Sequence, residues 1–527
     1  MPGLLFRDSQ PATTTAPNRA DVVCFVGFVG RRSTSPLPGR LKTWLQDQGW
    51  RPRGVAVADD DPLLDVPVPL DSFEAFDRLF IWETRPPQPH AFPFTTWLGA
   101  AVRSFFRQGG ARCFVVRTGD PAPYSLLGDS ATPAERTAFA AARLARLGAL
   151  LPGLPGSGVP AAEKAAPETW RGLGVLFGLE EAAFACLPDL PELVADSALE
   201  PAGLAPLPPA PENFVTCTPT VTPPRDEVRQ VSAGPACTDA GYLAWRTAVH
   251  HAALFIRTHR RDVQLLLSLP LPAPAVATAY TRNLDLETQV LGLGRGRTLD
   301  VNDGIATAFL QLCYPWVVTP GAEALPGGLE PPDGVFAGVL ARTIPELGAG
   351  HSIGRQPLRG VHGFEPGLAV DDLVLDTPAG ASPALIHRVS LLGPTPDGPR
   401  VLSDVTTSLS TAHRPASVGR LTAAILRAAR RLGDTVAFEP AGEDLARRIR
   451  TQLEQLLADF HAAGALQGLT PGEAYSVRCD TTTTTQNDLD NGRVIAEVRF
   501  TPSHPVGLLV VILSLRAGSV TALDVLT

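Results

Sequence analysis

The sequence near the C-terminus contains the stretch Asp480-Thr481-Thr482-Thr483-Thr484-Thr485-Gln486-Asn487-Asp488-Leu489-Asp490-Asn491-Gly492-Arg493. Its Asn-Gly pair predicts a tight turn, because both residue types tolerate a positive φ. Residues 494–500 then have the composition of a strand, with polar residues alternating onto one face. Residues 508–515 are almost purely apolar and predict a strand that needs cover on both faces. Few residues follow that could pack against both faces of this strand, so the pattern indicates that a partner chain packs against it.

The longer stretch from Gly472 to Arg493, GEAYSVRCDTTTTTQNDLDNGR, resembles the C-terminal signature of contractile tail sheath proteins. That family covers phage tails, R-type bacteriocins and phage-tail-like contractile injection systems. The alternative interpretation of this stretch alone is an ordinary buried hairpin in an unrelated α/β protein. The rest of the chain decides between the two interpretations.

Two more segments resemble the same family, and the first of them lies upstream of the C-terminal stretch, as it does in the family. Residues 101–117, AVRSFFRQGGARCFVVR, are similar to a helix, a Gly-Gly pair and a strand. We expect Thr95 or Thr96 to cap this helix and Gly109 to end it. Residues 331–343, PPDGVFAGVLART, resemble a Pro-Pro-Ser-Gly element followed by Ala-Arg-Thr, with Asp in place of the small hydroxyl residue.

Composition indicates a globular protein that is made in the cytoplasm. The 527 residues suffice for two to four domains. The net charge of −8 is spread without long blocks, which argues against a nucleic-acid binder. No apolar run is long enough to span a membrane, and the first residues lack the pattern of a signal peptide. The seven cysteines contain no CxxC pair, which predicts free buried thiols in a reducing compartment.

Alternating helices and apolar strands in the middle of the chain predict an α/β fold with a mainly parallel sheet. The resemblance implies a multidomain sheath-type subunit, with a C-terminal α+β core, a subtilisin-like middle region and extended terminal strands that pair with neighbouring subunits. We expect five segments: an N-terminal arm at 1–20, the N-terminal part of the core sheath domain at 21–120, the middle α/β region with Pro/Gly linkers at 121–400, the C-terminal core domain with its terminal strand at 401–516, and a tail at 517–527.

Apolar stripes at helical spacing predict two helices in the C-terminal domain, at 416–432 and 444–463. Gly433 and Gly464 are expected to end them. A strand is expected just before the first helix, at 401–411.

No segment has the pattern of a catalytic or metal site. Gly128–Thr132 lacks the final glycine of a nucleophile elbow, and Gly292–Arg297 fits neither a dinucleotide fingerprint nor a P-loop. The His250-His251 pair and His259 lack the spacing of a zinc-binding HExxH motif. Asp488–Asn491 suggests an EF-hand loop but lacks its glycine position and final glutamate. We therefore expect no catalysis, no cofactor and no metal.

The resemblance implies strand pairing between subunits at both ends of the chain. An exposed strand edge can template pairing with another chain, and head-to-tail contacts that do not close generate a helical filament. The candidate pairing residues are Leu4, Leu5 and Phe6 in the arm, and Leu509, Val511 and Leu513 in the terminal strand. The candidate contact with an inner tube is the Arg-bearing face of the helix at 444–463, through Arg447, Arg448 and Arg450. The alternative for these arginines is a solvated surface face.

The resemblance implies a structural subunit of a contractile sheath, which polymerises helically around an inner tube and contracts to drive the tube into a target. The implied partners are further copies of the chain, the inner tube protein, and baseplate and cap or terminator proteins, without nucleic acid or direct membrane insertion. Assembly is expected in the cytoplasm, in an intracellular or released phage-tail-like particle. Two alternatives stay open: a minor sheath paralogue that forms a specialised ring at the baseplate or sheath end, and a soluble α/β hydrolase with a non-standard site.

Overall fold

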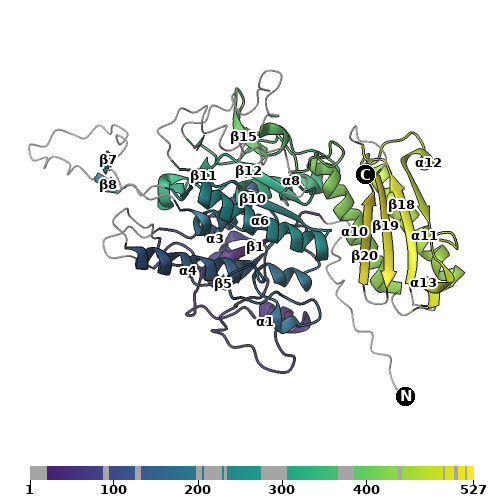
Figure 1. The fold of residues 1–527 in the computed structure, drawn as a ribbon, viewed down its shortest axis with the longest axis horizontal. Helices are drawn as coiled ribbons and strands as arrows, with labels where there is room; N and C mark the ends of the chain where they lie inside the picture. The colour runs from purple at the N-terminus through teal and green to yellow at the C-terminus, as the bar shows by residue number, and fades with distance from the viewer. Residues whose placement is uncertain are drawn as a thin grey trace, which may run out of the picture. The chain divides into compact units, whose positions relative to one another are not determined.

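A computed structural model of the chain describes residues 20–86, 94–124, 132–196, 204–206, 228–230, 234–273, 305–365, 385–436, 439, 442–490, 493–503, 509–516 and 519–526. The chain divides into two compact units, which are described separately (Figure 1). The α/β unit contains Val23–Thr343 and Ser352–Ala416. The C-terminal unit contains Ile344–His351, the chain from Ser417 onward and, of the described N-terminal residues, 20–22.

The α/β unit is built on an eight-stranded sheet with the order β16-β15-β12-β10-β6-β1-β5-β3. The six inner strands pair in parallel, and the two edge strands, β3 and β16, are antiparallel. The predicted mainly parallel sheet is therefore confirmed. The strands are β1 (Val23–Phe28), β3 (Val68–Leu70), β5 (Cys113–Gly119), β6 (Phe184–Cys186), β10 (Gln264–Ser268), β12 (Leu310–Tyr314), β15 (Ser390–Thr395) and β16 (Gly398–Val401).

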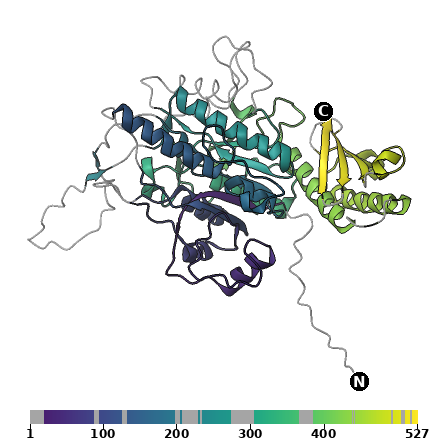
Figure 2. The ribbon, with the colours of Figure 1, turned by 60° about the horizontal axis from the view of Figure 1, so that its bottom comes forward.

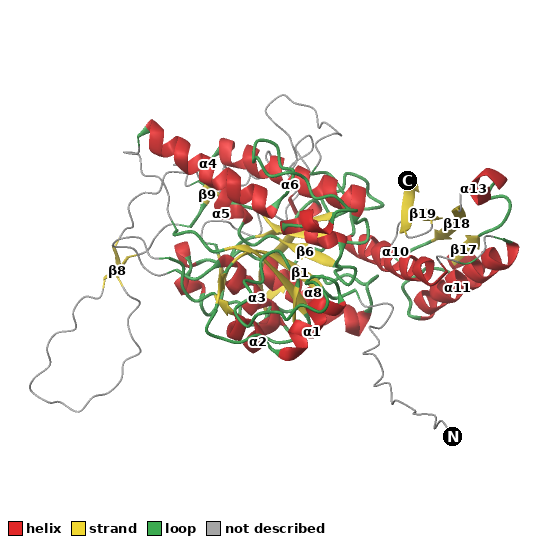
Figure 3. Cartoon of the chain, turned by 90° about the horizontal axis from the view of Figure 1, so that it is seen from below, coloured by secondary structure: helices red, strands yellow, loops and turns green. Residues whose placement is uncertain are grey.

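Helices cover both faces of this sheet, so its central strands are buried. Figure 3 shows α4 and α6 on one face and α1, α2 and α3 on the other. Every residue of β1 is buried, which accounts for its continuous apolar sequence. The helices are α1 (Gly39–Asp47), α2 (Phe73–Leu79), α3 (Trp97–Gln108), α4 (Pro133–Leu150), α5 (Leu190–Val194), α6 (Asp239–His259) and α8 (Asp333–Leu347).

Short elements complete this part of the chain. Four two-stranded pairs form: β2 (Gly30–Arg31) with β4 (Phe80–Ile81), β7 (Leu204–Pro206) with β8 (Val228–Gln230), β9 (Ala236–Cys237) with β11 (Leu271–Pro272), and β13 (Val317–Val318) with β14 (Gly363–Phe364). The 3₁₀ turns are η1 (Pro167–Thr169), η2 (Gly172–Phe177), η3 (Ala322–Ala324), η4 (Pro326–Gly328) and η5 (Leu385–His387).

The helix α3 begins and ends as its sequence predicts. The Thr96 side chain accepts a hydrogen bond from the Gly99 backbone N–H at 3.1 Å, so Thr96 is the N-cap. Gly109 follows the helix in the left-handed conformation, at a φ of 103°, which glycine adopts without a steric penalty.

Two glycines of the 331–343 segment allow α8 to lie directly against α3. A Cβ atom at Gly334 would lie 2.5 Å from the Ala101 Cα, and one at Gly338 would lie 2.6 Å from the Phe105 carbonyl oxygen. Both distances are far below van der Waals contact, so only glycine permits this approach of the two helices.

The C-terminal unit combines an antiparallel sheet with helices. The sheet order is β17-β18-β19-β20. Figure 2 shows the two long helices, in yellow-green, on one side of this sheet. The helix α11 packs on the sheet through a stripe of buried residues: Leu445, Ile449, Leu453, Leu457 and Phe460. The elements are α10 (Ala416–Val436), α11 (Glu443–Ala462), α12 (Pro471–Ala474), β17 (Tyr475–Arg478), α13 (Gln486–Asp490), β18 (Arg493–Phe500), β19 (Leu509–Arg516) and β20 (Ser519–Leu526).

Several expected boundaries differ from the structure. The boundary at residue 120 does not divide the fold, because β1 pairs with both β5 and β6 in one sheet. The strand expected at 401–411 ends at Val401, and the following residues belong to the α/β unit. Gly433 lies inside α10 rather than ending it, since one interior glycine costs only about 1 kcal/mol. The expected tail at 517–527 contains β20, which pairs along β19.

Some predictions concern residues outside those that the structure describes. These are the N-terminal arm with Leu4, Leu5 and Phe6, the Gly128–Ser130 and Gly292–Arg297 segments, and the Asn491-Gly492 turn. The described cysteines, by contrast, are all buried and free, as predicted. Among the described residues, no helix has both the length and the apolar character needed to cross a membrane.

Two carboxyl groups near the start of α8 are buried, and among the described residues no basic side chain forms a hydrogen bond with either. Asp333 is fully buried, and burial raises its pKa to about 8. Its Oδ1 accepts a hydrogen bond from the Gly334 backbone N–H at 3.0 Å, while Oδ2 has no hydrogen-bond partner among the described residues. Burial also raises the pKa of Glu330 to about 7. The fold therefore favours the neutral forms of both groups.

Replacing Asp333 with Asn is expected to stabilise the protein at alkaline pH. The unfolded carboxyl has a pKa of about 3.9, so the neutral group's contribution is complete below about pH 4 and is lost as the pH rises through about 8. Asn stays neutral, and we expect a gain of about 1–3 kcal/mol in the free energy of unfolding at pH 8.5. Denaturant unfolding from pH 5 to 9 measures this gain. The exposed Asp60→Asn change is the control, and equal pH profiles for wild type and Asp333→Asn would contradict the prediction.

Candidate assembly site

The strand β18 is the centre of the C-terminal sheet. Its residues alternate between half-buried and buried along its whole length, as the sequence predicts for a strand with one polar face. All eight residues pair with β19, from Arg493 opposite Arg516 to Phe500 opposite Leu509. On the other side, β17 pairs only with the second half of β18, from Glu497 to Phe500.

The threonine run replaces a strand along the first half of β18. The Ile495 backbone N–H donates to the Thr484 Oγ1 at 2.9 Å, and the Thr483 Oγ1 donates to the Ile495 carbonyl at 2.8 Å. These hydroxyl groups satisfy backbone groups that have no partner strand at this position. The structure thus gives a physical reason for consecutive threonines in this motif.

The next residues of the motif form a reciprocal cap on α13. The Asp488 backbone N–H donates to the Thr485 Oγ1 at 3.2 Å, and the Thr485 backbone N–H donates to the Asp488 Oδ2 at 3.1 Å. These hydrogen bonds lower the pKa of Asp488. Asp488 also lies 3.0 Å from the Arg493 guanidinium, so the cap is tied to the start of β18.

The candidate pairing residues of the terminal strand have partners within this chain. Leu509, Val511 and Leu513 lie opposite Phe500, Val498 and Ala496 of β18, and β20 runs along the other edge of β19. Within the described residues, the outer edges of the sheet therefore belong to β17 and β20. Pairing of the terminal strand with another subunit stays a prediction.

The candidate tube-contact arginines lie on the exposed face of α11. The side chains of Arg447, Arg448 and Arg450 are 71%, 56% and 52% exposed. Each forms an ion pair with a carboxylate: Arg447 with Asp444, Arg448 with Glu439 and Arg450 with Glu454. Exposed pairs of this kind contribute about 0–1 kcal/mol each, so a partner could replace them at little cost.

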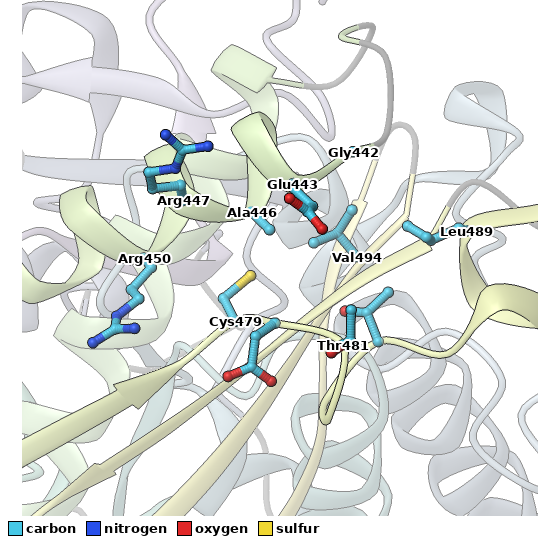
Figure 4. Close-up of a pocket in the computed structure, with 11 residues that line it drawn as sticks. Gly442, Glu443, Ala446, Arg447, Arg450, Cys479, Thr481, Leu489 and Val494 are labelled. Atoms are coloured by element: carbon cyan, nitrogen blue, oxygen red, sulfur yellow. The ribbon is translucent and has the colours of Figure 1, made fainter.

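A pocket of about 280 Å³ lies between α11 and the threonine run (Figure 4). Ala446, Leu489 and Val494 give it an apolar lining. Arg447 and Arg450 stand at the α11 side of this pocket. Two of the three candidate arginines therefore border a concave surface rather than a flat one.

The pocket holds a thiol that is poorly suited to covalent chemistry. Cys479 lines the pocket but is buried, and burial raises the pKa of its thiol to about 11. The thiol is therefore protonated at neutral pH, whereas a nucleophilic cysteine needs a lowered pKa. Among the described residues, no group of His, Cys, Asp and Glu side chains is arranged to hold a metal ion.

A buried ion pair occupies the carboxyl ends of the central strands in the α/β unit, where open α/β sheets commonly bind ligands. The Arg85 guanidinium donates two hydrogen bonds to Glu192, at 2.6 and 2.7 Å, and the Trp97 indole N–H also donates to Glu192. Asp189 accepts a hydrogen bond from the Phe28 backbone N–H at 2.9 Å, and burial raises the pKa of Asp189 to about 7. The sequence does not reveal this cluster, since its members are far apart in the chain and form no motif.

The structure is similar to chains of solved contracted particles and tail sheaths. It matches a chain of the anti-feeding prophage baseplate in its contracted state, with a TM-score of 0.54 and 16% identity over 96% of each chain. A chain of the anti-feeding prophage helical sheath in its contracted state gives 0.49 and 18% identity over 96% of each chain. The sheath tail protein Lin1278 from Listeria innocua gives 0.43 and 11% identity, over 95% of this chain and 96% of that one.

The first of these matches shows a shared fold over nearly the whole of both chains. The α/β fold that the sequence resemblance implies is therefore confirmed. No protein-family model matches the sequence, and no curated protein sequence matches it significantly.

Replacing Thr484 with Val is expected to destabilise the C-terminal unit. Thr484 is 7% exposed, and Val keeps its shape but removes the acceptor for the Ile495 N–H. A buried backbone donor without a partner costs about 1–3 kcal/mol. Denaturant unfolding measures the loss, and hydrogen exchange should show faster exchange at the Ile495 amide. The exposed Thr481→Val change serves as the control, and an unchanged exchange rate at Ile495 in Thr484→Val would contradict the assignment.

Proposed function

We propose that this chain is the structural subunit of a contractile sheath in a phage-tail-like contractile injection system. The fold shared with a chain of the anti-feeding prophage baseplate, over 96% of each chain, carries the proposal. The three sequence segments that resemble sheath proteins support it independently, and the C-terminal segment lies in the sheet that could link subunits. Copies of the chain would polymerise helically around an inner tube and contract to drive the tube into a target.

Subunits would be linked by exchange of the β19–β20 hairpin. The hairpin adds to β18 through backbone hydrogen bonds along eight paired residues, and an identical β18 in a neighbouring copy offers the same partner. Eight residues, 501–508, join β18 to β19, and two of them are prolines. Exchange would therefore replace contacts within one chain by the same contacts between two chains. Leu509, Val511 and Leu513 would then take the pairing role that the sequence assigns them.

The exposed face of α11 would contact the inner tube. Its arginines form exposed ion pairs with Asp444, Glu439 and Glu454. Carboxylates on the surface of a tube could replace these three residues as partners of the arginines. Weak, exchangeable contacts suit a tube that must be held before contraction and released during it.

A non-catalytic role fits the chemistry of the α/β unit. Glu192 is engaged by Arg85 and Trp97, and the buried thiols have raised pKa values that favour the unreactive form. The further partners would be baseplate and cap or terminator proteins, with no role for nucleic acid. Assembly would take place in the cytoplasm, in a particle that stays inside the cell or is released.

Neither alternative from the sequence gains an observation that favours it. A hydrolase would need an accessible nucleophile at the carboxyl ends of the central strands, where the buried Arg85–Glu192 pair lies. A minor ring subunit would share the fold of the main sheath and differ in where it assembles, so imaging of assemblies distinguishes the two.

A disulfide between β18 and β19 is expected to block assembly reversibly. The Ile495 N–H and carbonyl point to the threonine run, so Ile495 and Ser514 form a non-hydrogen-bonded pair, with Cα atoms about 4.5 Å apart. This separation suits a disulfide. Ile495→Cys with Ser514→Cys should therefore stay monomeric when oxidised and form striated tubes when reduced, by sedimentation and negative-stain microscopy.

Each single cysteine variant is the control and should assemble under both conditions. Tubes from the oxidised double variant with the disulfide within each chain would contradict hairpin exchange. A wild-type protein that stays monomeric with its cognate tube and baseplate would contradict the sheath function itself.

Reversing two charges on α11 is expected to weaken binding to the tube without affecting the fold. Arg447→Glu with Arg450→Glu replaces two exposed cations by anions, and like charges across the contact should weaken cosedimentation with tubes at least about tenfold. Arg53→Glu, an exposed arginine of the α/β unit, is the matched control. Unchanged cosedimentation of the double variant would exclude this face as the tube contact.

A further inference from the structure

Aromatic side chains from four segments meet at the surface of the α/β unit. Trp50 follows α1, Trp170 follows η1, Phe177 ends η2, and Phe255 and His259 lie in α6. His259 is exposed, and the other four side chains are half-buried. These five residues are called the aromatic cluster below.

Ring contacts join the members of the aromatic cluster to one another. The ring centroids of Trp50 and Trp170 lie 5.7 Å apart, and those of Trp170 and Phe177 lie 6.1 Å apart. The Phe177 ring also contacts Phe255 at 5.1 Å and His259 at 5.0 Å. Aromatic pairs at these distances stabilise one another beyond the effect of the area that they bury. The four segments are therefore held together at one place on the surface.

The two indole rings have fixed positions in the absence of any ligand. A Cβ atom at Gly178 would lie 2.3 Å from the Trp170 Cζ3 atom and 2.9 Å from the Trp50 Cη2 atom. Both rings therefore lie directly against the backbone, and only glycine permits this approach. The Trp170 indole N–H donates to the Glu163 carbonyl at 2.8 Å, which fixes the orientation of that ring. A preformed surface of this kind loses little conformational freedom when it binds a partner.

The aromatic cluster is more than is needed to close the core. Single exposed hydrophobic side chains are normal in soluble proteins, whereas a contiguous group of them marks an interaction surface. Four half-buried aromatic rings are contiguous here, and Leu254, next to Phe255, is 41% exposed. The ring surface that remains exposed is therefore available to a partner with apolar, ring-shaped or extended groups.

The same chain contains a segment with the chemistry of such a partner. Residues 201–224 contain eight prolines, or one residue in three, and PLPPAP at 206–211 contains two overlapping PxxP patterns. The strand β7 ends at Pro206, and residues 207–227 lie outside those that the structure describes. Proline-rich PxxP segments bind to surfaces lined by aromatic side chains, because proline restricts the backbone before binding and so lowers the entropic cost.

The charges at one edge of the aromatic cluster match those of this segment. Burial and then the positive charge of Lys164 lower the pKa of His259, so the exposed ammonium group lies on the His259 side of the cluster. Glu212 directly follows Pro211, the last residue of the PLPPAP sequence. An ion pair between Glu212 and Lys164 would give the bound segment a defined direction.

We propose that the aromatic cluster is a docking site for the proline-rich segment at 206–211 of this chain. The proline rings pack on the faces of Trp50, Trp170 and Phe255, and Glu212 lies toward Lys164. The site belongs to the α/β unit, and it does not depend on the proposed sheath function.

Binding of a synthetic peptide to the full-length protein tests the site. The probe is the fluorescently labelled peptide GLAPLPPAPENF, which corresponds to residues 203–214. The protein carries Pro208→Ala, Pro209→Ala and Pro211→Ala, so that its own segment does not compete with the peptide. Fluorescence anisotropy should show saturable binding. The same peptide with these three prolines replaced by alanine should not bind.

Substitutions in the aromatic cluster should weaken this binding. We expect Trp170→Ala and Phe255→Ala, each added to the triple-alanine protein, to raise the Kd at least about tenfold, because each removes a ring that packs on proline. Lys164→Glu should also weaken binding, and more at low salt than at high salt. Because Lys164 is exposed, this variant keeps the test valid if an aromatic substitution unfolds the protein.

Trp82→Ala is the matched control. Trp82 is also a half-buried tryptophan of the α/β unit, it contacts Phe73 at 5.2 Å, and its indole N–H donates to Asp77. This change should leave the Kd of the peptide unaltered. The absence of saturable binding to the triple-alanine protein would overturn the proposal. An unchanged Kd in Trp170→Ala, Phe255→Ala and Lys164→Glu would also overturn it.

A comparison with wild type identifies the copy of the chain that supplies the segment. Weaker binding of the peptide to wild type than to the triple-alanine protein, at any protein concentration, assigns the docked segment to the same copy. Equal binding at low protein concentration assigns it to a neighbouring copy.

Discussion

Both units depend on one constraint, which is that every buried backbone N–H and C=O group needs a hydrogen-bond partner. In the α/β unit, β1 satisfies it by pairing with strands on both sides, and helices then cover the two faces. In the C-terminal unit, β18 pairs with β19 along its whole length. On the opposite edge of β18, β17 pairs with the second half of the strand, and two threonine hydroxyl groups form hydrogen bonds with the Ile495 backbone in the first half. Within the part of the chain that the structure describes, β17 and β20 are the outer strands of this sheet.

Charged side chains in this protein occur in three different environments. The buried Arg85–Glu192 pair is fully hydrogen-bonded, so it fixes the packing at the carboxyl ends of the strands. The α11 arginines are paired but exposed, so their contacts can be exchanged for those of a partner. Arg388 is buried, and its Nε has no hydrogen-bond partner among the described residues.

Several features that depend on neighbouring residues were predicted correctly. The alternation along β18, the Thr96 cap of α3 and the glycine that ends this helix follow from side-chain period, capping chemistry and backbone freedom. Features that depend on distant partners were not predicted correctly. The sequence predicts a boundary at residue 120 and a tail after residue 516, because neither the β1–β6 pairing nor the β19–β20 pairing leaves a local signal.

The sequence by itself therefore determined the α/β class, several apolar strands, both ends of α3 and the motifs that resemble sheath proteins. Only the tertiary structure decided which strands are neighbours, that the terminal strand pairs within its own chain, and where charges meet, as at Arg85 and Glu192. The physical reason is the separation along the chain over which each interaction acts. Propensity and capping act over a few residues, whereas strand pairing and electrostatic repulsion act between segments that only the complete fold brings together.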